Sequence, residues 1–283
     1  MGSGLIEIKR RMKSIQNTKK ITKAMGLVAT SKLRKVRREL DVNNRYYNSL
    51  SYVTDELMTA LGDFKESVYI KGNNSEQKLF IVLTSDSGLC GGFNSNVVAY
   101  LNNNFSDDKL NNLVMVVGQK GIPYVKKRGF DTVAEYVDIA DVPTIRDART
   151  ITEHAIRKFK AGEVSEVNVV YTEFITTVKQ EVRVDKLLPF EIKEGKQNLN
   201  YTIEPDIETV FDQGMEVYLK GKVLNAMINS KSSEQSARMQ AMDGATKNAD
   251  DILDRLTTKY NRIRQSAITQ EISEIVGGAE AQK

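Results

Sequence analysis

The feature that most constrains the fold is a pair of long proline-free stretches, one toward each end of the chain. These stretches run from Leu5 to about Leu61 and from Ile207 to Ile275, and in the first stretch and the second half of the other, apolar residues recur at steps of three and four. This spacing is typical of helices that carry a narrow apolar seam. A helix over the first stretch would be roughly 80 Å long, too long for one side of a compact domain. Each helix therefore needs a partner, and we expect the two to pair antiparallel.

The spacing also predicts which residues form each seam. The N-terminal seam is expected to comprise Leu5, Ile8, Met12, Ile15, Ile21, Met25, Val28, Leu33, Val36, Leu40, Tyr47, Leu50 and Leu57. The C-terminal seam is expected to comprise Met242, Ala245, Ala249, Leu256, Tyr260, Ile263 and Ala267, with Ile252 or Leu253 in between. One step in the second seam is irregular, which a stutter would explain. Separate packing of each helix onto the middle of the chain remains an alternative.

Between these stretches the pattern changes to alternating strands and helices. Short apolar runs at 79–84 and 113–118 predict strands that are buried on both faces. Further strands are predicted within 166–174 and 178–190, and helices at 94–104, 122–127 and 145–159. We therefore predict an α+α/β fold, in which a long antiparallel two-helix coiled coil carries an inserted Rossmann-like α/β domain. The expected boundaries are 1–71 and 206–283 for the helices and 76–205 for the α/β domain.

A glycine-rich turn follows the first predicted strand, in the sequence TSDSGLCGGFNSNV from Thr84 to Val97. Neither the P-loop pattern nor the dinucleotide pattern G-x-G-x-x-G fits its spacing. We interpret the turn as a corner between strand and helix, with glycines at positive φ and Asn94 or Ser95 capping the helix. Asp86 is expected to cap a turn, although a role as metal ligand or base remains an alternative.

The remaining candidates for chemistry are few. Cys90 is the only cysteine and His154 the only histidine, so neither an internal disulfide nor a His-based metal site is expected. A nucleophilic pair of these two residues is an alternative to a buried thiol. No apolar run is long enough to span a bilayer, and the start has no apolar signal core. We expect no catalytic site and a cytoplasmic protein that reaches a membrane only through partners.

Positive charge is concentrated in residues 5–40. This segment has twelve Lys or Arg against Glu7 and Glu39, a local net charge of +10. Such a concentration indicates an acidic partner, which could be nucleic acid, lipid headgroups or an acidic protein surface. The basic residues share the segment with the apolar seam instead of preceding it as in a basic zipper. The pattern favours a cationic rod inside a protein cavity, with a nucleic-acid-binding coiled coil and a stand-alone enzyme as rival classes.

Both ends of the chain resemble one known family. The stretch IKRRMKSIQNTKKITKAMGLVATSKLRK resembles the start of the gamma subunit of the bacterial F-type (rotary) ATP synthase, and SEQSARMQAMDGATKNADDILDRLTTKYNRIRQSAITQEISEIVGGA resembles its end. The sequence LTSDSGLCGGFN is also similar to a signature of that family. The resemblance implies a central rotor shaft without its own active site, which couples ion flow through a membrane ring to ATP synthesis or hydrolysis on other subunits.

The resemblance also implies contacts, residue by residue. Contacts to the catalytic ring are expected at Met25, Arg238, Gln265, Thr269 and Glu274. An apolar tip that turns in a sleeve is expected at Ile272, Ile275 and Val276, and contacts to the membrane rotor ring at Tyr201 and Glu204. Met25 could equally be a seam residue.

The implied partners are the alpha and beta subunits of the catalytic ring, the epsilon subunit and the c-subunit ring. No nucleic acid partner and no membrane insertion are expected. This chain is expected to bind no cofactor or metal, because ATP, ADP and Mg would be held by the partner subunits. The implied location is peripheral, on the cytoplasmic face of the cell membrane.

Overall fold

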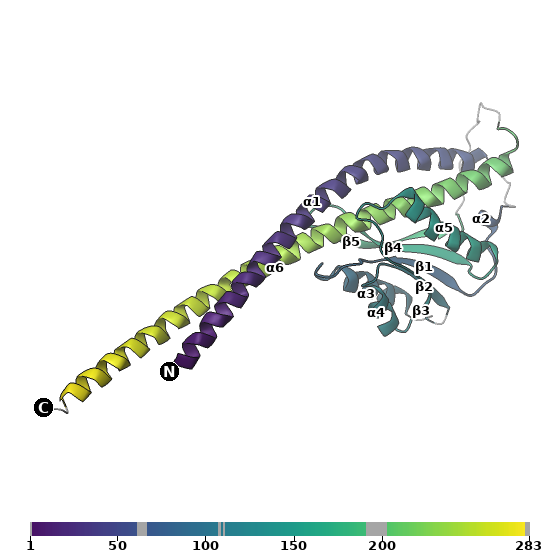
Figure 1. Cartoon of the computed structure of the whole chain (residues 1–283). Helices are drawn as coiled ribbons and strands as arrows, with labels where there is room; N and C mark the ends of the chain where they lie inside the picture. Colours follow the sequence, from purple (N-terminus) through teal and green to yellow (C-terminus); the bar gives the residue numbers. More distant parts are fainter. Residues whose placement is uncertain (1, 61–66, 107–108, 110, 191–202, 281–283) are drawn as a thin grey trace. The chain divides into compact units, whose positions relative to one another are not determined.

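The computed structural model describes residues 2–60, 67–106, 109, 111–190 and 203–280. Two helices account for both ends of the chain, α1 over Gly2–Ala60 and α6 over Ile207–Glu280 (Figure 1). The chain divides into two compact units, one made of Met1–Ala29 with Met239–Lys283 and the other of Thr30–Arg238. The predicted domain boundaries follow the secondary structure, whereas these units divide each long helix. None of the described helices is long and apolar enough to cross a bilayer.

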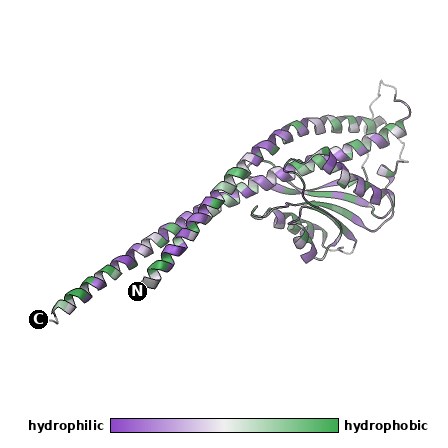
Figure 2. Ribbon diagram, viewed as in Figure 1, coloured by the Kyte–Doolittle hydropathy of each residue, from purple (hydrophilic) through white to green (hydrophobic). Residues whose placement is uncertain are grey.

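The second unit contains a five-stranded sheet in the order β3-β2-β1-β4-β5. Strands β1 (Lys78–Leu83), β2 (Asn112–Val117), β3 (Asp131–Tyr136) and β4 (Glu166–Phe174) are parallel, and β5 (Gln180–Leu188) is antiparallel to β4. The predicted Rossmann-like α/β domain is therefore confirmed, with one antiparallel edge strand added. In Figure 2 the central strands are coloured hydrophobic, in agreement with β2, in which every residue is buried.

Helices cover both faces of this sheet. On one face α3 (Phe93–Phe105) and α4 (Ile122–Lys127) pack with the side chains of Phe80, Val82 and Val114. On the other face lie α5 (Ile145–Lys160) and the first part of α6, and the short α2 (Val68–Lys71) adds Tyr69 to that core. Besides Ala226, α6 contributes five residues to this core that recur every four positions, namely Phe211, Met215, Leu219, Val223 and Met227. This spacing places one apolar stripe of α6 on the sheet.

In the same unit α1 and α6 run antiparallel. The Tyr47 and Tyr218 hydroxyls are 3.3 Å apart, and the side-chain amide of Asn225 donates to Asn43 and Asn44 on α1. Further along, Leu40 packs against Ile228. As the residue number rises on one helix it falls on the other, as the sequence predicted for the paired ends.

Two elements escaped the sequence prediction. The strand β3 has the sequence DTVAEY, whose alternation is weak because its residues are only partly buried at the edge of the sheet. The helix α2 has four residues, which is too short for a periodic signal.

The prediction that Asn94 or Ser95 caps the helix after the glycine-rich turn is wrong. Gly92 is the N-cap of α3, because the buried Asn94 uses its side-chain oxygen to accept a bond from the Ser85 N–H.

Candidate functional site

The first unit is held together by a seam that alternates strictly between steps of four and three. Its buried and half-buried members on α1 are Ile8, Met12, Ile15, Lys19, Thr22, Gly26 and Ala29. On α6 they are Met242, Thr246, Ala249, Leu253, Leu256, Tyr260, Ile263 and Ala267. The choice between Ile252 and Leu253 is thus settled for Leu253, and with Thr246 in the seam no irregular step remains.

Small and polar side chains meet across this seam. The Thr22 and Thr246 hydroxyls are 2.8 Å apart, and Lys19 forms an ion pair with Asp250. A β-carbon placed on Gly26 would lie 3.5 Å from the Met242 β-carbon, so the two backbones approach closely there. These contacts fix the antiparallel register of the pair, since each matches one position of α1 with one of α6.

The apolar residues predicted for part of this seam lie on the outside instead. Ile21 is 59% and Val28 is 54% exposed, so the prediction that they are seam residues is wrong. The step from Ile15 to Ile21 skipped a seam in which lysine, threonine, glycine and alanine follow one another, a combination that an apolar pattern cannot detect. Leu27 and Ile6 are exposed as well, at 66% and 71%.

The outer surface of α1 in this unit is therefore both apolar and cationic. We call it the outer face, defined by Ile6, Ile21, Leu27, Val28 and the exposed cations Lys9, Arg10, Arg11, Lys13, Lys20 and Lys23. A groove of about 710 Å³ opens on it, between Ile6, Met12 and the neighbouring cations of α1 and Tyr260 of α6. Exposed apolar side chains that gather on one side of a helix are candidates for contact with another protein.

The residues expected to contact a catalytic ring are dispersed over both units. In the first unit Met25 is half-buried beside Gly26, and Gln265, Thr269 and Glu274 are exposed. The tip residues are exposed too, with Ile272 at 56%, Ile275 at 72% and Val276 at 54%. The contact roles of these residues stay predictions.

Two further groups of predicted contacts lie in or near the second unit. Arg238 is buried and donates to the Ser87 and Gly88 carbonyls, at 2.9 and 3.3 Å. Of the residues expected to contact a membrane ring, Glu204 is exposed, and Tyr201 lies outside the described residues.

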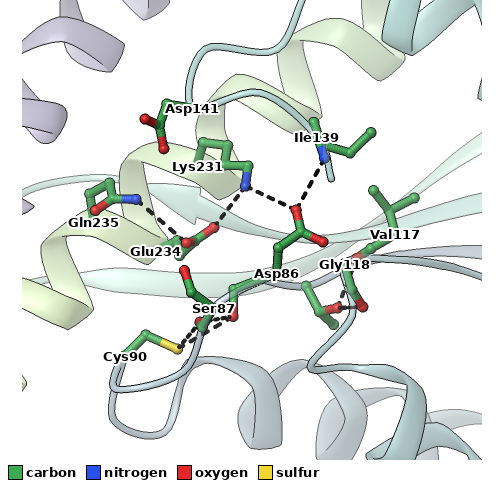
Figure 3. Close-up of polar contacts among 12 residues, drawn as sticks. Asp86, Ser87, Cys90, Val117, Gly118, Ile139, Asp141, Lys231, Glu234 and Gln235 are labelled. Atoms are coloured by element: carbon green, nitrogen blue, oxygen red, sulfur yellow. Dashed lines mark hydrogen bonds and ion pairs between the residues drawn. The ribbon is translucent and has the colours of Figure 1, made fainter. Parts of the chain in front are cut away.

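The second unit has a polar network at the carboxyl ends of its parallel strands (Figure 3). The Asp86 carboxylate accepts hydrogen bonds from the backbone N–H groups of Gln119, Asp138 and Ile139, at 3.0 to 3.2 Å. Asp86 thus joins the loops that follow β1, β2 and β3. Asp86 was expected to cap a turn. It does accept backbone N–H bonds as a cap does, but from the loops after β2 and β3 and not from its own turn.

Buried charges of α6 continue this network. The Lys231 ammonium lies 3.8 Å from Asp86 and 3.2 Å from Glu234, and Arg238 lies 2.9 Å from Glu234. Glu234 is almost completely buried. The two cations and two carboxylates balance one another, which is the condition under which charges are tolerated in an interior.

The glycine-rich turn carries no nucleophilic pair. Cys90 is buried, 3.6 Å from the Ser85 hydroxyl and 3.5 Å from the Asn94 amide. His154 lies elsewhere, with its Nδ1 atom 2.7 Å from the Tyr136 hydroxyl. Burial lowers the pKa of His154, and the nearby Lys158 and Arg157 lower it further. Within the described ranges, no group of three or more His, Cys, Asp or Glu side chains could hold a metal ion.

Comparison with known proteins gives a consistent result over the full chain. The model of the family described as ATP synthase matches residues 4–282. The ATP synthase gamma chain of Clostridium perfringens (strain SM101 / Type A) is 57% identical over 282 residues, which is 100% of this chain and 99% of that relative. The gamma chain of Clostridium pasteurianum is 53% identical over 283 residues, with both chains covered completely.

Solved structures show the same fold. A chain in the central stalk and c-ring structure of the Tetrahymena thermophila mitochondrial ATP synthase has a TM-score of 0.65 and 25% identity, covering 80% of this chain and 99% of that one. A chain in the Euglena gracilis mitochondrial OSCP/F1/c-ring structure, in rotational state 3, has a TM-score of 0.76 and 18% identity, covering 100% of this chain and 95% of that one.

Proposed function

The chain belongs to the family of ATP synthase gamma chains, and from this premise we propose how its two units act in an F-type synthase. As a gamma chain it is a non-catalytic subunit and the central rotor shaft, which couples ion flow to ATP synthesis or hydrolysis. The helix pair of the first unit is the part that we place inside the ring of alpha and beta subunits. The α/β unit is the part that we place toward the epsilon subunit and the c-subunit ring, at the cytoplasmic face of the cell membrane.

The coupling follows from symmetry. A single asymmetric pair of helices presents different side chains to each of three catalytic subunits. Each subunit is thereby biased toward a different conformation, and so toward a different affinity for nucleotide. Turning the shaft by one third of a circle exchanges the three affinities, so ion flow that turns the shaft drives release of ATP.

The outer face is the single observation that carries this proposal. Its exposed isoleucine, leucine and valine side chains need a partner to leave water, and its cations favour an acidic one. These side chains do not contribute to packing between the two helices, because the seam consists of other residues. The opposite partner helix has a different set of side chains, which supplies the asymmetry that the coupling requires.

The remaining parts of the proposal concern ligands and the far end of the rotor. We place ATP, ADP and Mg on the partner subunits, because the carboxyl edge of the sheet is occupied by the chain's own Asp86 and Lys231. Contact with the membrane rotor ring is assigned to Tyr201 and Glu204 by resemblance to the family.

The test exchanges the apolar part of the outer face for polar side chains. The variant Ile21→Ser/Val28→Ser should reduce co-purification with the nucleotide-binding subunits at least tenfold. Each fully buried side chain of this size contributes about 1.5–3 kcal/mol, so two of them correspond to a tenfold loss or more. The matched control is Tyr52→Ser/Val53→Ser, whose side chains are 64% and 49% exposed on α1 in the second unit. Equal recovery of both variants with the ring would contradict the proposal.

A further inference from the structure

The sheet of the second unit has a topological switch point. The strand order β3-β2-β1-β4-β5 reverses between β1 and β4, and the helices that follow β1 and β2 cover the opposite face from α5. In open α/β sheets, ligands bind in the crevice outside the carboxyl ends of the strands at such a point. The loop after β1 and the hairpin between β4 and β5 border this crevice.

A polar stretch of α6 fills the crevice. We call residues 229–238, with the sequence NSKSSEQSAR, the polar run. All but one of them are buried, although nine of the ten carry polar or charged side chains. A cavity remains between Thr84, Ile139, Ser230 and Lys231, with a volume of about 10 Å³. That is about the space one water molecule needs, so the helix takes the place of a ligand.

One side of the polar run binds the loop after β1. Lys231, Glu234 and Arg238 follow at steps of three and four, so they share one face of the helix. Lys231 pairs with Asp86 and with Glu234 (Figure 3). Arg238 donates to the Ser87 carbonyl at 2.9 Å and also pairs with Glu234.

The opposite side of the polar run binds β4 and the hairpin. The Ser233 hydroxyl donates to the Thr172 carbonyl at 3.1 Å, and the Ser236 hydroxyl donates to the Thr177 carbonyl at 2.7 Å. At about 100° per residue, Ser233 and Ser236 lie roughly 140–200° around the helix from Lys231. The crevice therefore holds α6 from two sides.

We propose that the polar run is a two-sided clamp. It prevents α6 from rotating about its own axis relative to the sheet, so that torque passes between α6 and the rest of the α/β unit. The apolar stripe from Phe211 to Met227 also holds α6, but hydrophobic contact has no preferred direction. Hydrogen bonds weaken steeply when their angles change, so the clamp resists rotation that apolar packing permits. This role rests on the proposed function as a rotor, and Ser233 and Ser236 are positioning residues in it.

The test compares two pairs of buried serines in the same helix. The variant Ser233→Ala/Ser236→Ala removes both hydroxyls that bind another element. The control Ser230→Ala/Ser232→Ala removes two hydroxyls of matching burial. Within the part of the chain that the structure describes, the Ser232 hydroxyl bonds only to the Ile228 carbonyl in its own helix. The Ser230 hydroxyl forms no hydrogen bond to another helix, strand or loop among the described residues.

Two quantities are measured in the assembled complex. Amide hydrogen exchange in the hairpin, at Val178 and Lys179, should quicken about 30-fold in the first variant and stay unchanged in the control. The ratio of ion-driven ATP synthesis to unloaded ATP hydrolysis should fall at least threefold in the first variant alone. A merely structural role would lower both activities together and leave this ratio unchanged. If the double variant does not assemble, Ser236→Ala is compared with Ser232→Ala in the same two measurements.

The possible outcomes distinguish a failure of the clamp proposal from a failure of the proposed rotor function. An unchanged ratio in Ser233→Ala/Ser236→Ala, or an equal fall in the control, overturns the clamp. If instead a complex with the unaltered chain synthesised no ATP from an ion gradient, the proposed function would be contradicted. Amide hydrogen exchange in the hairpin would then be the only measurement left to test whether the polar run acts as a clamp.

Discussion

The close approach of Gly118 to Thr84 permits a prediction about the carboxyl edge of the sheet. Gly118 has a φ of +102°, and a β-carbon there would lie 2.4 Å from the Thr84 carbonyl oxygen. Left-handed backbone strain costs about 1–3 kcal/mol, and overpacking against a rigid backbone costs about 1–3 kcal/mol more. We therefore expect Gly118→Ala to lower the free energy of unfolding by about 4 kcal/mol.

Gly129→Ala is the matched control for this prediction. Gly129 also has a positive φ, of +79°, but nothing lies within 4 Å of a β-carbon placed on it. Its substitution should cost about 1 kcal/mol, from backbone strain alone. Urea unfolding, followed by circular dichroism, measures both variants, and equal losses of stability would refute the close approach at Thr84.

Three further outcomes are expected. Met25→Lys adds a cation beside the seam; assembly should persist while the ATP made per ion translocated falls, and an unaltered ratio in reconstituted vesicles would count against the contact. Replacing Ile272, Ile275 and Val276 by Asp should weaken assembly or turnover of the complex, and unchanged ATPase activity would argue against a bearing role. Burial lowers the pKa of His154, so its neutral form is favoured in the fold and stability is lost as the pH falls below the ordinary value of 6.5. The single imidazole resonance in an NMR titration should therefore move at a lower pH than that of an unfolded peptide.

The fold was largely predictable because its signals are local and long. Two proline-free helices and the apolar runs of β1 and β2 are continuous in sequence, and the structure confirms them. Edge strand β3 was missed because only part of its surface is buried. The seam between Ile15 and Leu33 was assigned to the wrong residues, since close packing there depends on small and polar side chains that carry no hydrophobic signal.

The network at the sheet edge could not have been predicted from the sequence. Asp86 and Lys231 are separated by 145 positions, and nothing in the local pattern of either indicates the other. The one available hint was the run NSKSSEQSAR, which is too polar for a buried helix unless a polar crevice receives it. Arg238 shows the same limit, because its local sequence does not indicate its partners Ser87 and Glu234 in the second unit; its contact with the catalytic ring stays a prediction.

Direct observation of rotation tests the account most simply. The one native cysteine is buried, so a cysteine introduced at the exposed Lys127 would accept a fluorescent probe on the α/β unit. With the nucleotide-binding subunits fixed to a surface, the probe should turn in one direction in steps of one third of a circle as ATP is hydrolysed. A probe that stays still while the same complex hydrolyses ATP with full ion coupling would contradict the claim that this chain is a rotating shaft.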